Sequence, residues 1–319
     1  MPKRRVLLSS LTAALVLAAP TAAAAQEPVP PAPAKTTVKL AFKGLIQRQV
    51  LGGESWNIKG TVSNYIAGQS IDLTITRRGR EIVKRRLAIR DEGGVGRFTL
   101  PMKLSGAGRL TIRASHAATA EMAATQSLAS HVTVVARYAA RGSRGLAVKY
   151  LQRRLSKLGY VVGQRGYYYA RTGRAVLAFR KVTRMARTYT ASAEVFRRLA
   201  RGEGRFKVRY KNHGRHVEID LRHQVLALIN RGKAVRIYPT SSGKPSTPTI
   251  LGKYRVYRKD PGTNALGMIY SSYFIRGYAV HGFVDVPIYP ASHGCLRLPP
   301  SEAISVYNWI RMGTRVDTY

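Results

Sequence analysis

Short stretches in which apolar and polar residues alternate occupy the chain between about residues 36 and 137. Alternation with a period of two is typical of strands that bury one face. Gly-rich turns such as Gly52-Gly53 separate these stretches. Strands at this spacing predict an all-β sandwich over residues 36–137. The alternating stretches are 55–62, 70–76, 97–100, 109–114 and 131–136.

Apolar residues then recur at helical spacing, which predicts a small three-helix bundle over residues 140–202. In the first predicted helix, Leu146, Leu151 and Leu155 fall on one face, and Gly159 is placed to end the helix. Two further helices are predicted from apolar clusters that begin at Ala175 and at Val195.

The pattern returns to strands over residues 205–319, with predicted strands at 216–221, 225–230 and 234–238. The segment 230–233 is predicted to be a hairpin turn. After a long loop and further strands, a helix is predicted at 301–310, with Ser301 as its N-cap behind two prolines. The chain is therefore predicted to be multidomain, and its last domain β-rich with a peripheral helix.

The N-terminus has the layout of a secretory signal peptide. Basic residues precede an apolar run that ends at Pro20, and small residues follow as far as Ala25. The run is shorter than the ~20 apolar residues that a membrane-spanning helix needs. We expect cleavage of residues 1–25 on export, against the alternative of an uncleaved anchor, and a Pro-rich linker over 26–35. The mature protein would then be extracytoplasmic with no stable membrane span.

The chain is strongly basic, with 54 Lys and Arg against 15 Asp and Glu and a net charge of +39. Such a charge attracts polyanions, and for an exported bacterial protein the polyanion at hand is an anionic cell-wall polymer. Nucleic acid is not an expected partner, because the chain carries an export signal and no recognised nucleic-acid-binding motif. Biased residue usage and a solvated surface are the alternative explanation of the charge.

The segment Ser292-His293-Gly294-Cys295 carries the candidate chemistry. Cys295 is the only cysteine, which excludes an intramolecular disulfide and a cysteine-linked lipid anchor. A lone cysteine is usually a small buried hydrophobe. Here, however, Gly294 lets the backbone turn so that amides near the sulfur can converge on one oxygen. A histidine from a neighbouring strand, such as His281, can pair with the thiol.

These residues make the C-terminal part resemble the L,D-transpeptidases, with their YkuD-like catalytic domain. The resemblance implies that Cys295 is the nucleophile and that His281 is the base, oriented by a backbone carbonyl. It also implies that His293, Gly294 and Ser292 shape the pocket and the oxyanion hole. The matching stretches are 217–221, 242–245, 247–249, 278–282, 292–297 and 313–316.

The same resemblance suggests residues that contact substrate. Arg297 matches the arginine of the family and is suited to bind a substrate carboxylate in bidentate fashion. Gly282, Tyr270 and Tyr289 are further candidates for substrate contact, although tyrosines in a β domain are more often packing residues. No cofactor is implied. The histidines at 213, 216 and 223 do not follow a known metal-ligand spacing.

Two further resemblances concern the preceding domains. Residues 140–202 resemble the small peptidoglycan-binding module of wall enzymes, although Arg165 stands where that module usually has Asp and Tyr169 where it has Gly. Residues 36–137 resemble bacterial immunoglobulin-like modules by pattern alone. With the catalytic resemblance, these features imply a protein of cell-wall biogenesis and cell shape, located at the wall.

The implied reaction is peptidoglycan L,D-transpeptidation, in which a thioester on Cys295 leads to 3-3 cross-links between stem peptides. Carbapenems are the expected inhibitors. Three alternatives remain open on the sequence: a carboxypeptidase or wall-linkage hydrolase that uses the same cysteine, a non-catalytic wall-binding protein, and a polyanion binder driven by charge alone.

Overall fold

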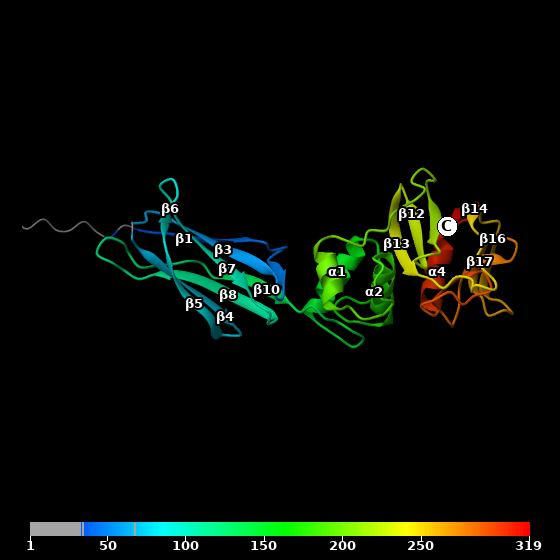
Figure 1. Ribbon diagram of the computed structural model, residues 1–319, viewed down its shortest axis with the longest axis horizontal. Helices are drawn as coiled ribbons and strands as arrows, with labels where there is room; N and C mark the ends of the chain where they lie inside the picture. The colour runs from blue at the N-terminus through cyan, green and yellow to red at the C-terminus, as the bar shows by residue number, and fades with distance from the viewer. Residues whose placement is uncertain (1–32, 34, 67) are drawn as a thin grey trace, which may run out of the picture.

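The computed structural model of the protein describes residue 33, residues 35–66 and residues 68–319. The predicted signal segment and most of the predicted linker lie outside these residues. Within the part of the chain that is described, no helix is long and apolar enough to cross a membrane. A strand-rich N-terminal part, a helical part and a C-terminal part follow one another along the long axis of the molecule (Figure 1).

The N-terminal part consists of two β-sheets that share one hydrophobic core. One sheet has the strand order β1-β3-β7-β6 and the other β2-β10-β8-β4-β5, with β9 paired to β8. Trp56, Ile58, Leu73 and Ile112 are among the residues buried between them. The strands are β1 (Val38–Lys43), β2 (Gln49–Leu51), β3 (Ser55–Val62), β4 (Ser70–Arg77), β5 (Arg80–Ala88), β6 (Arg90–Asp91), β7 (Gly96–Lys103), β8 (Gly108–His116), β9 (Thr125–Gln126) and β10 (Ser130–Val135).

The predicted alternating stretches all coincide with strands of this part, namely β3, β4, β7, β8 and β10. Strand β5 escaped prediction because it is rich in Arg and mostly exposed, and it pairs only with β4 at the edge of its sheet. An edge strand with exposed charge lacks the apolar alternation from which strands are predicted. The immunoglobulin-like character of the two-sheet part stays a prediction.

The helical part contains α1 (Leu146–Lys157), α2 (Ala170–Val182) and α3 (Ala193–Ala200), close to the three predicted helices. Its core includes Leu155, Phe179 and Leu199. Gly159 follows α1 with φ +94°, a left-handed conformation that favours glycine and ends the helix. The likeness of these helices to a peptidoglycan-binding module stays a prediction.

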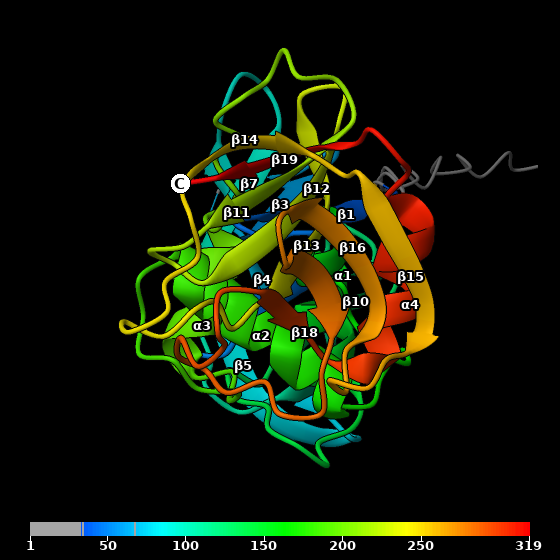
Figure 2. The same cartoon turned by 90° about the vertical axis from the view of Figure 1, so that its right-hand side faces the viewer.

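The C-terminal part contains two sheets and one helix, α4 (Pro300–Trp309). The sheet order is β13-β12-β11-β19-β14 in one and β15-β16-β17-β18 in the other, with α4 beside them (Figure 2). Val217, Val280 and Leu296 belong to the core that the sheets share. The strands are β11 (His216–Asp220), β12 (Val225–Asn230), β13 (Lys233–Pro239), β14 (Gly252–Arg255), β15 (Arg258–Thr263), β16 (Ile269–Ile275), β17 (Tyr278–Gly282), β18 (Leu296–Leu298) and β19 (Arg315–Thr318).

Two local predictions for this part have different outcomes. The hairpin between β12 and β13 turns at Arg231 and Gly232, whose φ values of 49° and 69° are those that a two-residue type I′ turn requires. The capping prediction for α4 is wrong, because the helix begins at Pro300 and Pro299 occupies the cap position without a side-chain hydrogen bond. Proline suits the first helical position since its missing N–H has no partner there anyway, so Ser301 lies inside the first turn.

The helical part and the C-terminal part are packed together as one unit. Their common core includes residues of α1, α2 and α3 together with residues of β12 and β13. Lys181 of α2 is buried and donates hydrogen bonds from Nζ to the carbonyl oxygens of Gln224 (3.1 Å) and Thr240 (3.0 Å). Arg171 and Arg174 of α2 both donate to Glu302 of α4, whose side chain is only 4% exposed.

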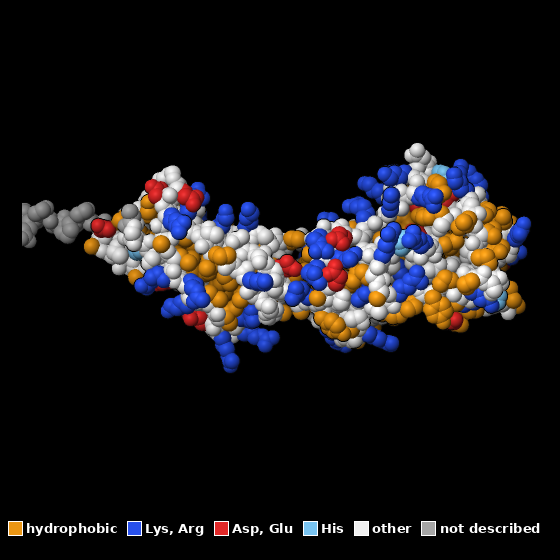
Figure 3. Space-filling model, viewed as in Figure 1, with side chains coloured by type: hydrophobic (Ala, Val, Ile, Leu, Met, Phe, Trp, Pro, Cys, Tyr) orange, Lys and Arg blue, Asp and Glu red, His pale blue; other side chains and the backbone are white. Residues whose placement is uncertain are grey.

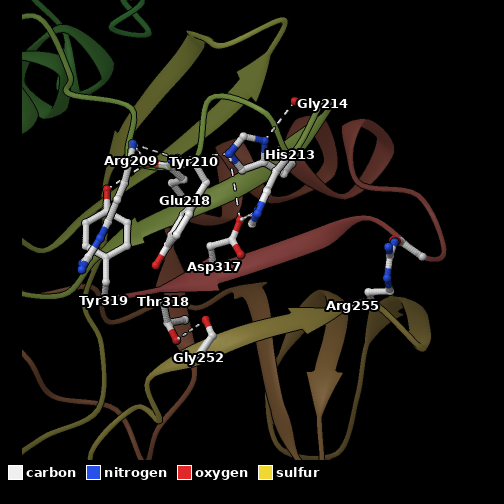
Figure 4. A network of polar contacts seen from close by, with 12 residues as sticks. Arg209, Tyr210, His213, Gly214, Glu218, Gly252, Arg255, Asp317, Thr318 and Tyr319 are labelled. Carbon is white, nitrogen blue, oxygen red and sulfur yellow. Dashed lines mark hydrogen bonds and ion pairs between the residues drawn. The ribbon is translucent and has the colours of Figure 1, made fainter.

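A buried polar network lies around β11 and the C-terminal end of the chain, next to β19 (Figure 4). The carboxylate of Glu218 accepts hydrogen bonds from the backbone amides of Arg209 and Tyr210 and from the hydroxyl of Tyr319. It also lies 3.1 Å from Nε2 of His216. The side chains of Glu218 and His216 are fully buried.

Hydrogen bonding outweighs burial in this network. Burial by itself would raise the pKa of Glu218, but the bonds from His216 and the two amides hold it below its ordinary value. Burial would lower the pKa of His216, but the bonds to Glu218 and to the carbonyl of Gly214 raise it. At mildly acidic pH, Glu218 is therefore a carboxylate and His216 an imidazolium.

We expect Glu218→Gln to lower the free energy of unfolding by about 3 kcal/mol, because it removes the nearest counter-charge of a buried imidazolium and leaves only Asp317, 4.0 Å away. The contribution of Glu218 is present above the ordinary glutamate pKa of 4.5 and is lost as pH falls. That of His216 is present below the ordinary histidine pKa of 6.5 and is lost as pH rises. Denaturant unfolding across this range should therefore show the largest difference between parent and variant at pH 4.5–6.5. The exposed Glu81→Gln serves as control, and a pH-independent difference would contradict the ionised pair.

Candidate functional site

Parallel pairing of β17 with β18 sets the positions of the candidate catalytic residues. In the register, Val280 lies opposite Leu296 and His281 opposite Arg297. Side chains alternate between the two faces of a strand. Val280 and Leu296 point into the main core, so His281 and Arg297 lie on the opposite face, and Cys295, one residue before β18, belongs to that same face.

The sulfur of Cys295 lies in a small apolar cluster. Met268, Tyr273 and Ala279 form the cluster, and Cys295 packs against it, half-buried. The backbone amide of Ala279 donates to Sγ at 3.4 Å. The thiol in turn donates toward the carbonyl oxygen of Gly277 at 3.5 Å. The thiol is thus held by backbone groups of the β16–β17 hairpin and of β17 itself.

The imidazole of His281 is buried and held in one orientation. Its Nδ1 donates to the carbonyl oxygen of Gly282 at 2.8 Å. A proton on Nδ1 leaves Nε2 as the nitrogen that can accept a proton. Phe283 packs edge-on against the ring, with 5.9 Å between the ring centroids. The backbone carbonyl that orients this imidazole is therefore that of Gly282, and the role of His281 as a base stays a prediction.

The surroundings of the two candidate catalytic side chains, His281 and Cys295, keep both of them neutral. Burial is the largest influence on His281 and lowers its pKa to about 4, and the nearby charge of Arg297 acts in the same direction. Burial also raises the pKa of the Cys295 thiol, against the weaker effects of the Ala279 amide and of Arg297. Both groups are therefore uncharged at neutral pH. A thiol beside a neutral imidazole reacts by proton transfer to the base rather than from a preformed ion pair.

Arg297 is held above the ring of Phe283, with its guanidinium carbon 4.2 Å from the ring centroid. It also lies 3.7 Å from a carboxylate oxygen of Asp285. The side chain of Asp285 is 72% exposed, so this ion pair is solvated and weak. An arginine with a loosely held partner can exchange it for the carboxylate of a substrate.

The turn before Cys295 depends on Ser292 and Gly294. The hydroxyl of Ser292 donates to the carbonyl oxygen of Cys295 at 2.6 Å and accepts from the amide of Gly294 at 3.0 Å. Gly294 has φ +120°, and a Cβ there would lie 2.3 Å from a ring carbon of Tyr278. Only glycine fits this position. Among the residues described, no acceptor is found for the amide of Cys295, which leaves that N–H available to an oxyanion.

The loop 241–249 holds this turn in place through hydrogen bonds. Ser242 accepts from the amide of Ser292 through its carbonyl oxygen at 2.9 Å. Thr249 donates from its hydroxyl to the carbonyl oxygen of Gly294 at 2.6 Å. Ser241 and Arg297 exchange backbone hydrogen bonds. The loop that belongs to the sequence resemblance is therefore a scaffold for the turn that carries Cys295.

The other predicted site residues lie at varied distances from this chemistry. Gly282 packs against α4, where an added Cβ would come 2.6 Å from the Cβ of Ala303, and it contributes its carbonyl to His281. His293 is exposed. Tyr270 lies with its ring 5.2 Å from that of Tyr307 on α4. Tyr289 is 58% exposed and accepts a hydrogen bond from Ser241 through its carbonyl oxygen.

The structure thus brings Cys295, His281 and Arg297 together on one face, with Ser292, Gly294 and Gly282 as their backbone support. The hydrogen bonds of the Cys295 sulfur among the described residues are to backbone groups, and none involves His293, Tyr270 or Tyr289. In the same part of the chain, no group of three or more His, Cys, Asp and Glu side chains is placed to hold a metal ion.

Sequence reasoning missed three neighbours of the thiol and the base. Ala279 supplies an amide to Sγ, Tyr278 closes the space beside Gly294, and Phe283 packs against both His281 and Arg297. All lie within or next to the segment 278–282 that carries the resemblance. Their closeness to His281 in the sequence could have pointed to them, but what each one contacts depends on the register of the strands.

The geometry agrees with comparisons to known proteins. Residues 214–317 match the YkuD family, the L,D-transpeptidase catalytic domain. An L,D-transpeptidase from Xylanimonas cellulosilytica is 35% identical with a TM-score of 0.53, covering 57% of this chain and 98% of that chain. One from Stackebrandtia nassauensis is 22% identical with a TM-score of 0.37, covering 57% and 94%. The catalytic domain of the E. faecium L,D-transpeptidase acylated by ertapenem is 27% identical with a TM-score of 0.29, covering 33% and 97%. Comparison with curated proteins gives no match.

We expect Arg297→Met to raise the pKa values of both His281 and Cys295. The positive charge of Arg297 disfavours the imidazolium and favours the thiolate, so its removal shifts both groups upward. NMR titration of His281 should show a midpoint above the parent value of about 4, and thiol alkylation should need higher pH. Arg255→Met, on the other sheet, is the control. Unchanged midpoints would mean that the guanidinium does not act on the pair.

Proposed function

Because this chain belongs to the L,D-transpeptidase family, we propose that it is a peptidoglycan acyltransferase that forms 3-3 cross-links through a thioester on Cys295. The observation that carries the proposal is the arrangement of Cys295 and His281 on one sheet face. The Nδ1 of His281 is committed to the carbonyl of Gly282, so Nε2 is the base. An isolated wall-binding module has no need of a buried imidazole with this orientation.

In the first step, Sγ of Cys295 attacks the carbonyl carbon of the third residue of a tetrapeptide stem, which is bonded to the nitrogen of the terminal D-alanine. Nε2 of His281 takes the thiol proton and then passes it to the amine of the leaving D-alanine as the C–N bond breaks. The amide of Cys295 is the donor proposed for the oxyanion, since the amide of Gly294 is already bonded to Ser292. The product is a thioester between the stem and Cys295.

In the second step, the amine of another stem attacks the thioester carbonyl. His281 takes a proton from this amine, and the departing sulfur recovers it as a thiol, so that the enzyme returns to its starting state. The apolar cluster of Met268, Tyr273 and Ala279 around the sulfur favours transfer over hydrolysis because it limits the access of water. Arg297 is proposed to hold a carboxylate of the donor stem in place of Asp285.

The remaining features fit an enzyme that works outside the cytoplasm at the wall. Lys and Arg side chains are spread over all three parts of the molecule on the face shown in Figure 3. With a net charge of +39, the protein would be attracted to anionic wall polymers. Together with the signal-like N-terminus, this charge leads us to propose an exported, wall-associated protein.

We expect the parent protein to convert purified tetrapeptide muropeptides into cross-linked dimers, measured by mass spectrometry. Cys295→Ala should abolish the dimers with little loss of stability, since the change removes one sulfur atom from a half-buried site. His281→Gln should slow the reaction about 100-fold or more, because the proton acceptor is lost. Tripeptide products without dimers would favour the carboxypeptidase alternative instead.

We also expect one molecule of a carbapenem to add covalently to the parent and none to Cys295→Ala, as measured by intact mass. The strained amide of the drug is opened by the thiol with no group lost, so the mass increase equals the whole drug. Gly294→Ala should label with a small thiol reagent yet acylate poorly, because its Cβ would collide with Tyr278 and distort the turn. Gly163→Ala, where a Cβ makes only ordinary contacts, is the control. Failure of the parent to acylate while its thiol remains reactive would contradict a formed oxyanion hole.

A further inference from the structure

A cavity of about 500 Å³ lies between the helical part and the C-terminal part. We call it the interdomain crevice. Tyr169 and Tyr189 line it from the helical part, and Val284, Val286 and Pro300 line it from the C-terminal part. Tyr169, Tyr189 and Val284 are exposed to 48%, 46% and 81%, so the crevice presents aromatic and aliphatic side chains to a ligand from solution.

The charged groups of the crevice are all positive. Arg141 and Arg174 line it, and the lining contains no Asp or Glu. Arg141 is exposed and has no hydrogen-bond or ion-pair partner among the described residues. Arg174 shares the carboxylate of Glu302 with Arg171, and its Nε is buried without a partner among the same residues. Two guanidiniums on one carboxylate, together with the free Arg141, leave a net positive charge.

The N-terminus of α2 adds to this field. The helix begins at Ala170 in the wall of the crevice, and Tyr169 at its cap position makes no side-chain capping bond. The unpaired amides of a first helical turn carry partial positive charge. The helix end therefore reinforces the guanidiniums, and the crevice as a whole is suited to an anion attached to an apolar body.

One wall of the crevice is shared with the candidate active site. Val284 and Val286 belong to the connection between His281 and Ser292. On one side of this connection, Asp285 lies beside Arg297. On the other side, Arg187 of the helical part donates to the carbonyl oxygen of Ile288 at 3.2 Å. A ligand in the crevice thus contacts the same segment that flanks the guanidinium of Arg297.

We propose that the interdomain crevice binds a carboxylate-bearing segment of the peptidoglycan stem peptide, outside the reacting centre. This inference rests on the proposed function for the identity of the ligand. A peptide is favoured over sugar because the lining lacks Asp, Glu, Asn and Gln, the side chains that most readily accept hydrogen bonds from sugar hydroxyls. The guanidiniums bind carboxylates, and the tyrosines, valines and prolines cover aliphatic groups.

Binding is tested without turnover, in the full chain carrying Cys295→Ala, by calorimetric titration with a soluble disaccharide-tetrapeptide. Adding Arg141→Ser should weaken binding about tenfold, the effect of losing one charge-assisted hydrogen bond. Amidation of the carboxylates of the probe should weaken its binding to the Arg141 protein by a similar factor. Lys157→Ser removes one positive charge from an exposed position of α1 that does not line the crevice, and it should leave the affinity unchanged.

The outcomes separate this inference from the proposed function. Equal affinity in the Arg141→Ser and parental chains, with both folded by thermal unfolding, overturns the crevice site. Equal loss in Lys157→Ser also overturns it, because the effect would then be general charge attraction. Binding of the disaccharide alone as tightly as the full probe overturns the choice of peptide. Failure of the proposed function appears elsewhere, as the absence of dimers and of an acyl-enzyme in the unmodified chain.

Discussion

The parallel pairing of β17 with β18 is the constraint on which the rest of the site depends. It places His281 opposite Arg297 and turns both away from the core that holds Val280 and Leu296. A shift of one residue would move the imidazole into that core and the valine to the site, because side chains alternate along a strand. The register thus fixes the face of the sheet on which the site lies. The glycine turn before Cys295 places the sulfur on that same face.

Burial of this face has a chemical consequence. Because the imidazole and the thiol are both removed from water, each is neutral at rest, with the pKa of His281 lowered to about 4 and that of Cys295 raised. A neutral pair leaves no buried charge that needs a partner in the absence of substrate, and in the mechanism we propose the proton moves only when the carbonyl is attacked. The positive charge of Arg297 lowers the pKa values of both groups, because it favours the thiolate and disfavours the imidazolium.

The helical part acts as more than an appended module. It completes a core with β12 and β13, and Lys181 reaches from α2 to the carbonyl oxygens of Gln224 and Thr240. Burial lowers the pKa of Lys181 to about 7. A buried amine needs hydrogen-bond partners, and the two carbonyl oxygens supply them across the contact between the two parts. Thr240 in turn donates its hydroxyl to the carbonyl of Arg297. The module is thereby connected to the segment that carries the site.

The sequence by itself determined much of this protein. Alternation located β3, β4, β7, β8 and β10, helical spacing located α1, α2 and α3, and the motif brought Cys295, His281 and Arg297 forward as a group. Tertiary structure alone decided the charged edge strand β5, the proline start of α4, the exposure of His293 and Tyr289, and the packing of Tyr270 against Tyr307. Local patterns record which face of an element is apolar. Which elements face each other depends on register and packing between segments far apart in the chain, and no local pattern contains that information.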